Sequence, residues 1–234
     1  DTDPSNPEVF FVQRNEKLAF LGGFYAFPGG QCDAHDAHAP VANCVDQDSR
    51  TAISCAAREL FEELGVLVAR GADTLTKGQR ASLLDDLSSE RMTWPQLLQH
   101  YDLQLDGNDF TFVGRWVTPP FSSRRFDTWF FLTKCPAKQA PIVTPGELAS
   151  GEWIAAGEAY DRWRRSEILA TPPTLHALKT LGDGLTPELV ERFLSVPQAH
   201  REHVRRIEFR PNYICFPVRT PTKPPATHTN WYLI

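Results

Sequence analysis

The sequence has no apolar run approaching the roughly 20 residues that a helix needs to span a bilayer, and no charged-then-apolar leader opens it. It also lacks an excess of positive charge, because 24 Lys and Arg against 29 Asp and Glu give a net charge of −5. A chain without a basic field cannot hold nucleic acid non-specifically. We therefore expect neither a membrane nor a nucleic acid as its partner.

No two cysteines have the CxxC spacing, and their total of five is odd. This pattern favours reduced thiols and a cytoplasmic protein. Four potential zinc ligands do lie close together, with the spacing C-x2-H-x2-H-x5-C: Cys32, His35, His38 and Cys44. This spacing is unlike that of common structural zinc sites, so a solvated loop is the favoured interpretation.

The composition that remains, 41% hydrophobic and 23% charged, is ordinary for a globular protein with a core. Apolar and β-branched patterns predict strands at 8–13, 20–27, 110–118, 128–133, 153–154 and 207–218. Periodic patterns predict helices at 51–64, at 155–166, 172–181 and 187–194, and two within 77–101. Residues 31–50 are predicted to be a polar surface loop, and the proline-rich C-terminal end an extended arm.

Three glutamates share one face of the predicted helix at 51–64. Successive helical residues are rotated by about 100°, which places Glu59, Glu62 and Glu63 within about 100° of one another. Like charges this close repel, and a hard divalent cation would relieve the repulsion because Mg²⁺ and Mn²⁺ prefer carboxylate oxygens. The alternative is a solvated acidic face, which is the commoner meaning of such charge runs.

The sequence around these glutamates resembles the Nudix box, GX5EX7REUXEEXGU, in which U is a bulky apolar residue. Residues 58–66, RELFEELGV, match every specified position of its second half, and Gly30 of the FPGG segment at 27–30 matches its first half. The box has 13 residues between Gly30 and Arg58, whereas this sequence has 27, so 14 are inserted.

The insertion leaves the first Glu of the box missing or displaced. Counted forward from Gly30, that position falls on Asp36, and counted back from Arg58 it falls on Arg50. Asp46 and Asp48 are further carboxylates that could stand in for it.

An interrupted box of this kind resembles one branch of the family, the peroxisomal coenzyme A diphosphatases and their bacterial relatives. The segments WVTP at 116–119, RFDTWFFL at 125–132 and EL followed by EWI at 147–154 look like that branch's motifs. Ala19 stands where coenzyme A-specific members have an arginine. Residues 224–234 are similar to the entry strand of a metallo-β-lactamase-fold domain, which follows the Nudix domain in some bacterial relatives, so we expect a further domain to be missing.

The resemblance implies an α/β fold, the Nudix α/β/α sandwich with a mixed sheet between helices. The Nudix domain would cover residues 1–165, with an insertion in the box at 31–50 and a helical insertion at about 70–108. Residues 166–234 would form a helical extension and an extended C-terminal arm. The sequence leaves open whether the protein forms a homodimer.

The resemblance also implies a chemistry. Glu59, Glu62 and Glu63 would hold Mg²⁺ or Mn²⁺, which would neutralise a diphosphate and activate a water molecule. The catalytic set would be Arg58, Glu59, Glu62 and Glu147, in which Arg58 orients a glutamate of its own helix and Glu147 is a further ligand or base. Glu147 could equally be an ordinary turn carboxylate. The candidates for substrate binding are Arg14, Gly29, Gly30, Arg124 and Arg125, and Arg124 and Arg125 could alternatively pair with Asp127.

Hydrolysis of a nucleotide-containing diphosphate is therefore the expected activity. Coenzyme A or an acyl-coenzyme A is the leading substrate, and it would give 3′,5′-ADP and 4′-phosphopantetheine or its acyl form. ADP-ribose and dinucleotides are the alternatives. A non-catalytic Nudix module that senses a nucleotide is the competing class, favoured by the absent Glu of the box and opposed by the intact carboxylate helix.

Overall fold

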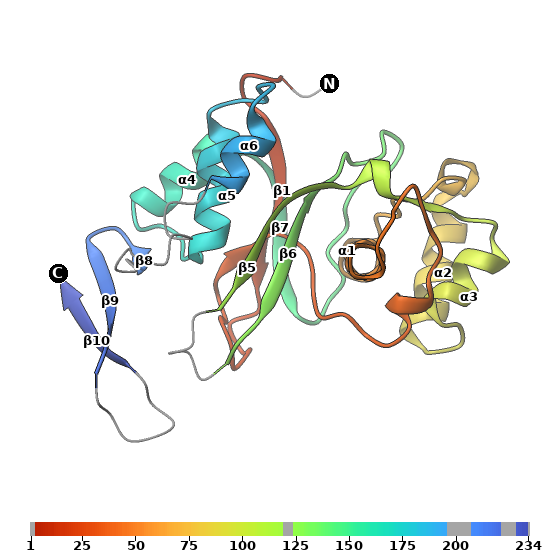
Figure 1. Cartoon of the computed structure of the whole chain (residues 1–234). Coiled ribbons are helices and arrows are strands. Elements are labelled where there is room, and N and C mark those ends of the chain that lie inside the picture. The colour runs from red at the N-terminus through yellow and green to blue at the C-terminus, as the bar shows by residue number, and fades with distance from the viewer. Residues whose placement is uncertain (1–2, 119–123, 196–206, 221–227, 234) are drawn as a thin grey trace. The chain divides into compact units, whose positions relative to one another are not determined.

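The computed structural model describes residues 3–118, 124–195, 207–220 and 228–233 (Figure 1). The chain divides into two compact units. The first is built from Asp1–Phe27, Val113–Phe130 and Glu152–Ile234, and the second from Pro28–Phe112 and Phe131–Gly151. None of the helices within the described ranges is long and apolar enough to cross a membrane.

The first unit is organised around strand β1 (Glu8–Arg14), which pairs antiparallel with the short β2 (Tyr25–Ala26). The strand order in this sheet is β2-β1-β7, where β7 is Leu148–Ala155. The division between the two units falls within β7, after Gly151. Phe11 is buried, and its ring packs 5.4 Å from Tyr25 and 5.7 Å from Phe27, measured between centroids. The apolar pattern of β1 thus supplies part of the core.

Three helices of the first unit, α4 (Ala156–Arg164), α5 (Pro172–Gly182) and α6 (Leu189–Leu194), lie together in Figure 1. Proline begins α5, where its missing N–H costs nothing. Strands β8 (Ile207–Arg210), β9 (Tyr213–Arg219) and β10 (His228–Leu233) form an antiparallel sheet in the order β10-β9-β8.

The second unit contains the long helix α1 (Gln47–Leu64) together with α2 (Lys77–Ser88) and α3 (Trp94–His100). Asp46 caps the start of α1 by accepting the Ser49 N–H, and Gly65 ends it in the left-handed conformation at φ 65°. Phe61 of α1 is fully buried and packs against Trp94 of α3, with centroids 6.2 Å apart. This packing holds one face of α1 and leaves its acidic face for other partners.

Short elements complete the second unit. The last strand pair described below, β5 with β6, contains residues of both units. The parallel strands β3 (Val41–Ala42) and β4 (Leu105–Asp106) pair with each other. Three 3-10 turns are η1 (Asp36–His38), η2 (Ala72–Thr74) and η3 (Gly107–Asp109). Strand β5 (Thr111–Val117) pairs with β6 (Asp127–Leu132).

The mixed α/β class, the helices within 77–101 and most strand positions agree with the sequence predictions. The predicted strand at 20–27 is reduced to two residues, because Leu21 and Gly23 have positive φ and turn the chain. The strand predicted at 153–154 is instead eight residues long. The C-terminal end is less of a free arm than predicted, since β10 pairs with β9, while residues 221–227 lie outside the described ranges.

The prediction that 31–50 is a solvated loop is wrong for several of its residues. Helix α1 begins at Gln47 rather than Thr51, so the end of the segment is helical. Asp36, Ala39 and Val41 are buried. Removing fourteen residues from this segment is expected to destabilise the second unit if Asp36 is among them, because Arg58 would lose its buried partner.

Candidate functional site

The predicted carboxylate face exists on α1 in the second unit. Ala57, Phe61 and Leu64 are buried on one side of the helix, whereas Glu59 and Glu62 keep 15% and 31% of their side chains exposed. The 3.6-residue period of the helix therefore separates an apolar side from an acidic one, as the sequence indicates.

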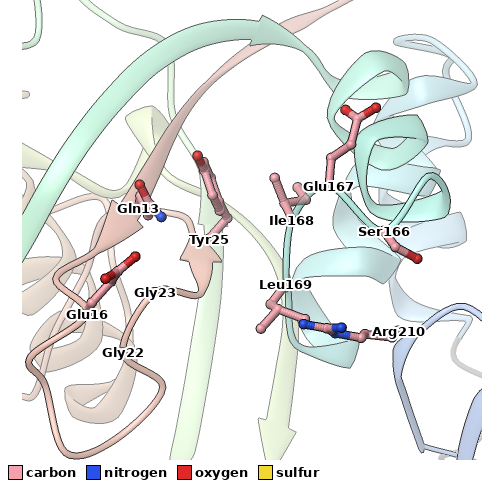
Figure 2. A pocket seen from close by; sticks show the side chains of 10 residues that line it. All are labelled: Gln13, Glu16, Gly22, Gly23, Tyr25, Ser166, Glu167, Ile168, Leu169 and Arg210. Carbon is pink, nitrogen blue, oxygen red and sulfur yellow. The ribbon is translucent and has the colours of Figure 1, made fainter.

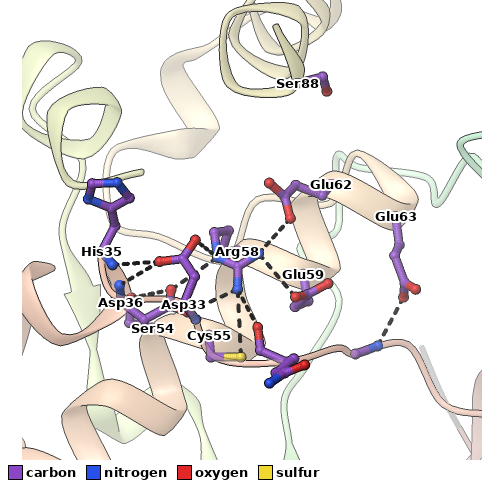
Figure 3. A network of polar contacts seen from close by, with 12 residues as sticks. Asp33, His35, Asp36, Ser54, Cys55, Arg58, Glu59, Glu62, Glu63 and Ser88 are labelled. Carbon is purple, nitrogen blue, oxygen red and sulfur yellow. Dashed lines mark hydrogen bonds and ion pairs between the residues drawn. The ribbon is translucent and has the colours of Figure 1, made fainter. Parts of the chain in front are cut away.

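Arg58 lies at the centre of this acidic face, and only 6% of it is exposed. Its Nη1 donates to Glu62 Oε2 at 2.7 Å and lies 3.0 Å from Glu59 Oε1 (Figure 3). Its Nη2 also donates to the carbonyl of Gln31 at 3.0 Å. A guanidinium offers five donors in a fixed plane, so one side chain can orient two glutamates and a loop at once.

Asp36, one of the positions considered for the first Glu of the box, is a further partner of Arg58. It is fully buried and accepts Arg58 Nε at 3.1 Å and Nη2 at 2.9 Å. Ser54 Oγ and the N–H of Asp33 also donate to it. A buried carboxylate needs such partners, because an unpaired one would cost several kcal/mol.

Asp36, the position that the forward count from Gly30 indicates for the first Glu of the box, thus contacts the Arg of the same box, and its role as a stand-in for that Glu stays a prediction. Asp46 is excluded from this role, because its side chain caps α1. The sequence could not choose between Asp36, Asp46 and Asp48, since the fourteen inserted residues break the fixed spacing on which the motif depends.

The site carries more negative than positive charge. One arginine faces Asp36, Glu59 and Glu62, and Asp33 lies 3.7 Å away from it. Burial raises the pKa values of Glu59 and Glu62 above the ordinary 4.5, although Arg58 opposes the shift. Burial works against the charge on Arg58, but the hydrogen bond with Asp36 and the neighbouring carboxylates hold its pKa above the ordinary value. This excess of carboxylate oxygens fits a hard divalent cation.

The three glutamates do not yet converge on one point. Glu59 and Glu62 face Arg58, whereas Glu63 Oε2 accepts the N–H of Gly29 at 2.9 Å. In Figure 3 Glu63 accordingly lies apart from the other two. A shared cation would require at least one of these side chains to change rotamer.

Gly29 and Gly30 both lie against the carboxylate helix. Gly29 has φ +147°, a conformation that residues with a Cβ rarely adopt. A Cβ built at Gly30 would overlap the carboxylate of Glu59. The two glycines therefore allow the backbone to pass directly beside the acidic side chains.

The variant Gly30→Ala is expected to bind Mn²⁺ at least about tenfold more weakly, while the chain still folds. The added methyl displaces Glu59 by rotating a flexible side chain, and changes to the groups that orient metal ligands typically cost about 10- to 100-fold in metal affinity. Gly78→Ala in α2 is the matched control, because a Cβ there meets nothing within 4 Å. Calorimetric titration and thermal melts of both variants test this. Equal Mn²⁺ affinities would show that Gly30 does not position Glu59.

Glu147 also belongs to the second unit and is exposed, in the turn immediately before β7. The preceding segment runs beside the end of α1, since Ile142 N–H donates to the carbonyl of Leu64 at 2.9 Å and Thr144 N–H to that of Glu63 at 2.8 Å. Glu147 is three residues further along, within about 10 Å of backbone reach. Its role as a ligand or base stays a prediction.

The three predicted arginines, Arg14, Arg124 and Arg125, belong to the first unit. Arg125 Nε donates to the carbonyl of Thr118 at 3.1 Å, and the Arg124 guanidinium lies 5.8 Å from the ring centre of Phe20. The alternative pairing of Arg124 and Arg125 with Asp127 is wrong. Asp127 instead accepts two hydrogen bonds from Arg115, a residue that the sequence analysis did not single out.

The first unit also contains a pocket of about 460 Å³ (Figure 2). Its lining comes from the β1–β2 region, from the segment after α4 and from β8: Gln13, Glu16, Gly22, Gly23, Tyr25, Ser166, Glu167, Ile168, Leu169 and Arg210. Arg14, Arg124 and Arg125 do not line it. Two carboxylates, Glu16 and Glu167, against the single cation Arg210 make it a poor site for a diphosphate.

Within the described ranges, the zinc candidates Cys32, His35, His38 and Cys44 do not come together as a set. Cys32 instead lies near Asp36 and Cys55, with one potential ligand atom of each within 4.8 Å of the others.

The chain is similar to known proteins in sequence and in structure. The family model described as the NUDT19 Nudix domain matches residues 42–181. The human acyl-coenzyme A diphosphatase NUDT19 is 26% identical, over 78% of this chain and 64% of that protein. Putative nudix hydrolase 7 of Caenorhabditis elegans is 26% identical, over 80% and 60%.

The chain spans between 60% and 64% of the length of the curated relatives that it matches. A crystal structure of a NUDIX hydrolase from Alicyclobacillus acidocaldarius superposes with a TM-score of 0.68 at 31% identity. That match covers 84% of this chain and 92% of the other, which confirms the fold class predicted from the sequence.

Proposed function

Because this chain belongs to the Nudix hydrolase family, in the branch defined by the NUDT19 Nudix domain, we propose that it hydrolyses a diphosphate linkage in a nucleotide derivative. The observation that carries the proposal is the Arg58-centred cluster on α1, in which the buried Asp36 pairs with Arg58. Coenzyme A or an acyl-coenzyme A is the proposed substrate, since three relatives carry the name acyl-coenzyme A diphosphatase.

Glu59, Glu62 and Glu63 are the residues that would hold Mg²⁺ or Mn²⁺, and the metal would neutralise the diphosphate and activate water. Arg58 fixes the carboxylates of Glu59 and Glu62, and Asp36 fixes Arg58. Gly29 directs its N–H to Glu63. These contacts fix the three carboxylates as the structure shows them, and at least one of the three would change rotamer to share a cation with the others.

In the proposed reaction, water adds to one phosphorus and the bond from that phosphorus to the bridging oxygen breaks. The products from coenzyme A are 3′,5′-ADP and 4′-phosphopantetheine, and an acyl-coenzyme A gives the acyl form of the latter. Glu147 is the proposed further ligand or base, and Arg14, Arg124 and Arg125 are proposed substrate contacts.

The competing function is nucleotide sensing without cleavage, and the absent Glu of the box argued mildly for it. The contact of Asp36 with Arg58 supplies a carboxylate within the interrupted box, which weakens that argument. The proposal is tested by measuring hydrolysis by the purified chain in the presence of Mg²⁺ or Mn²⁺. The substrates are coenzyme A, acetyl-coenzyme A, ADP-ribose and dinucleotides. We expect coenzyme A or its acyl form to turn over fastest. Tight binding without any turnover would establish sensing, and preference for ADP-ribose would correct the substrate.

Mn²⁺ at a concentration of 100 times its dissociation constant should stabilise the fold by about 2.7 kcal/mol, provided that it binds only the folded chain. Protons compete with the metal for Glu59 and Glu62, whose pKa values exceed 4.5, so the stabilisation should shrink as pH falls towards that range. Thermal melts with and without Mn²⁺ at several pH values measure this.

Crystals soaked in Mn²⁺ should show anomalous density within about 2.5 Å of at least two of the three helix carboxylates. The Glu59→Gln variant is the control and should show weaker density. Density only beside Cys32 and Cys55, or at His35 and His38, would contradict the assignment.

A further inference from the structure

Two thiols that the proposed reaction does not use lie beside its site. Cys32 is exposed on the segment that follows Gly30, and Cys55 is buried on α1, one turn before Arg58. Both are free, and their sulfur atoms are no more than 4.8 Å apart. A disulfide requires about 2.05 Å between sulfurs. Cys32 is outside any helix or strand, so rotation of its side chain can supply most of the approach.

We propose that Cys32 and Cys55 form a peroxide-sensitive pair, whose oxidation to a disulfide ties the 31–36 segment to α1 and slows the proposed hydrolysis. The exposed thiol of Cys32 meets the oxidant first. Hydrogen peroxide converts it to a sulfenic acid and leaves one water. Cys55 then forms the S–S bond and releases the sulfenic oxygen as a second water, so the pair loses two hydrogens and two electrons in total.

A metal ion is a poorer occupant of the same position. Asp36, the third potential ligand, already gives both its carboxylate oxygens to Arg58. The Arg58 guanidinium also lies close to the sulfur of Cys55, with Nη2 at 3.8 Å, where it would repel a cation. The same positive charge opposes the rise in the pKa of the Cys55 thiol without cancelling it, and the thiolate is the form that attacks a sulfenic acid. Burial works in the other direction and raises the pKa of the Cys55 thiol, so the second step is expected to be the slow one.

The consequence for activity rests on the proposed function. Cys32 adjoins Gln31, whose carbonyl accepts Arg58 Nη2, and Cys55 contacts the same nitrogen. Drawing the two sulfurs together shifts both partners of Arg58, which also holds Glu59 and Glu62. Displacements of about 1 Å near a reacting centre are costly, so we expect kcat to fall on the order of tenfold or more in the oxidised form.

The test of the pair itself does not need activity. The chain is treated with hydrogen peroxide, its free thiols are counted, and its peptides are mapped by mass spectrometry. We expect the number of free thiols to fall from five to three and a peptide linking Cys32 to Cys55 to appear. Dithiothreitol should reverse both changes. The melting temperature should rise by several degrees in the oxidised form, because the 32–55 loop is closed.

Cys32→Ser changes an exposed side chain and should fold normally while forming no linked peptide. Cys55→Ser is the second test and should likewise form no linked peptide. Cys44→Ser is the matched control, in which the Cys32–Cys55 disulfide should still form. Three results would each overturn the proposal. The first is sulfinic acid at Cys32 without any linked peptide, and the second is a disulfide from Cys32 to Cys44. The third is protection of both thiols by one equivalent of zinc. If the disulfide forms in a chain that hydrolyses no diphosphate, the proposed function fails while the pair stands.

Discussion

Replacing Glu62 with Gln is expected to lower kcat for the preferred diphosphate by at least about 100-fold, with the fold intact. The change keeps the size of the side chain but removes a charge that Arg58 holds at 2.7 Å. Loss of one preorganised group that acts in the transition state typically costs a factor of 10² to 10³. Because Glu62 is a partly exposed group on the helix surface, with 31% of its side chain accessible, stability should change little.

The comparison is with Glu191→Gln, an exposed glutamate of α6 in the first unit. That variant should keep wild-type kcat and KM. Steady-state kinetics at saturating Mg²⁺ and Mn²⁺ measure both variants, and circular dichroism melts check their folding. Full activity in Glu62→Gln would mean that another carboxylate performs this role, and the site assignment would then be wrong.

Arg58→Met should be the most destabilising single substitution near the site. It leaves Asp36 buried and fully enclosed, with only Ser54 and the N–H of Asp33 as donors. Removing one partner of a buried ion pair typically costs about 3 to 5 kcal/mol, because the other charge is left uncompensated. Activity should also be lost, since Glu59 and Glu62 lose the group that orients them.

Arg70→Met provides the matched control in the same unit. Arg70 pairs with Asp109 at 2.9 Å, but 57% of its side chain is exposed, so its loss should cost less than about 1 kcal/mol. The double variant Arg58→Met, Asp36→Leu should recover much of the stability without recovering activity, because a buried pair can often be replaced by apolar residues. Urea unfolding measures all three variants. Equal losses for Arg58→Met and Arg70→Met would show that the buried pair does not stabilise the fold as proposed.

The carboxylate face could be predicted from the sequence because it depends on local geometry. Glu59, Glu62 and Glu63 are fixed relative to one another by the period of a single helix, and the apolar residues between them determine which side is buried. The end of that helix at Gly65 could also be predicted from the sequence, since a glycine after the last periodic residue is a local stop signal. The start was missed by four residues, because the N-cap is Asp46 within a segment whose polar composition indicates a loop.

The partner of Arg58 was decided by the tertiary structure. Asp36 is 22 residues away along the chain, and the insertion removes the fixed spacing that would identify it. Only the folding of the 31–36 segment onto α1 buries its carboxylate, and burial then requires a positively charged partner. The pairing of Arg115 with Asp127, rather than of Arg124 or Arg125, likewise depends on which strand residues face each other.

The sequence by itself therefore determined the family, the mixed α/β class and the acidic helix, because motif spacing and helical period are local properties of the chain. The tertiary structure decided which distant residues meet that helix: Asp36 against Arg58, Gly29 against Glu63, and Cys32 beside Cys55. Contacts between segments follow from the path of the backbone between them, and a composition that is polar and rich in small residues leaves that path undetermined until the whole unit packs.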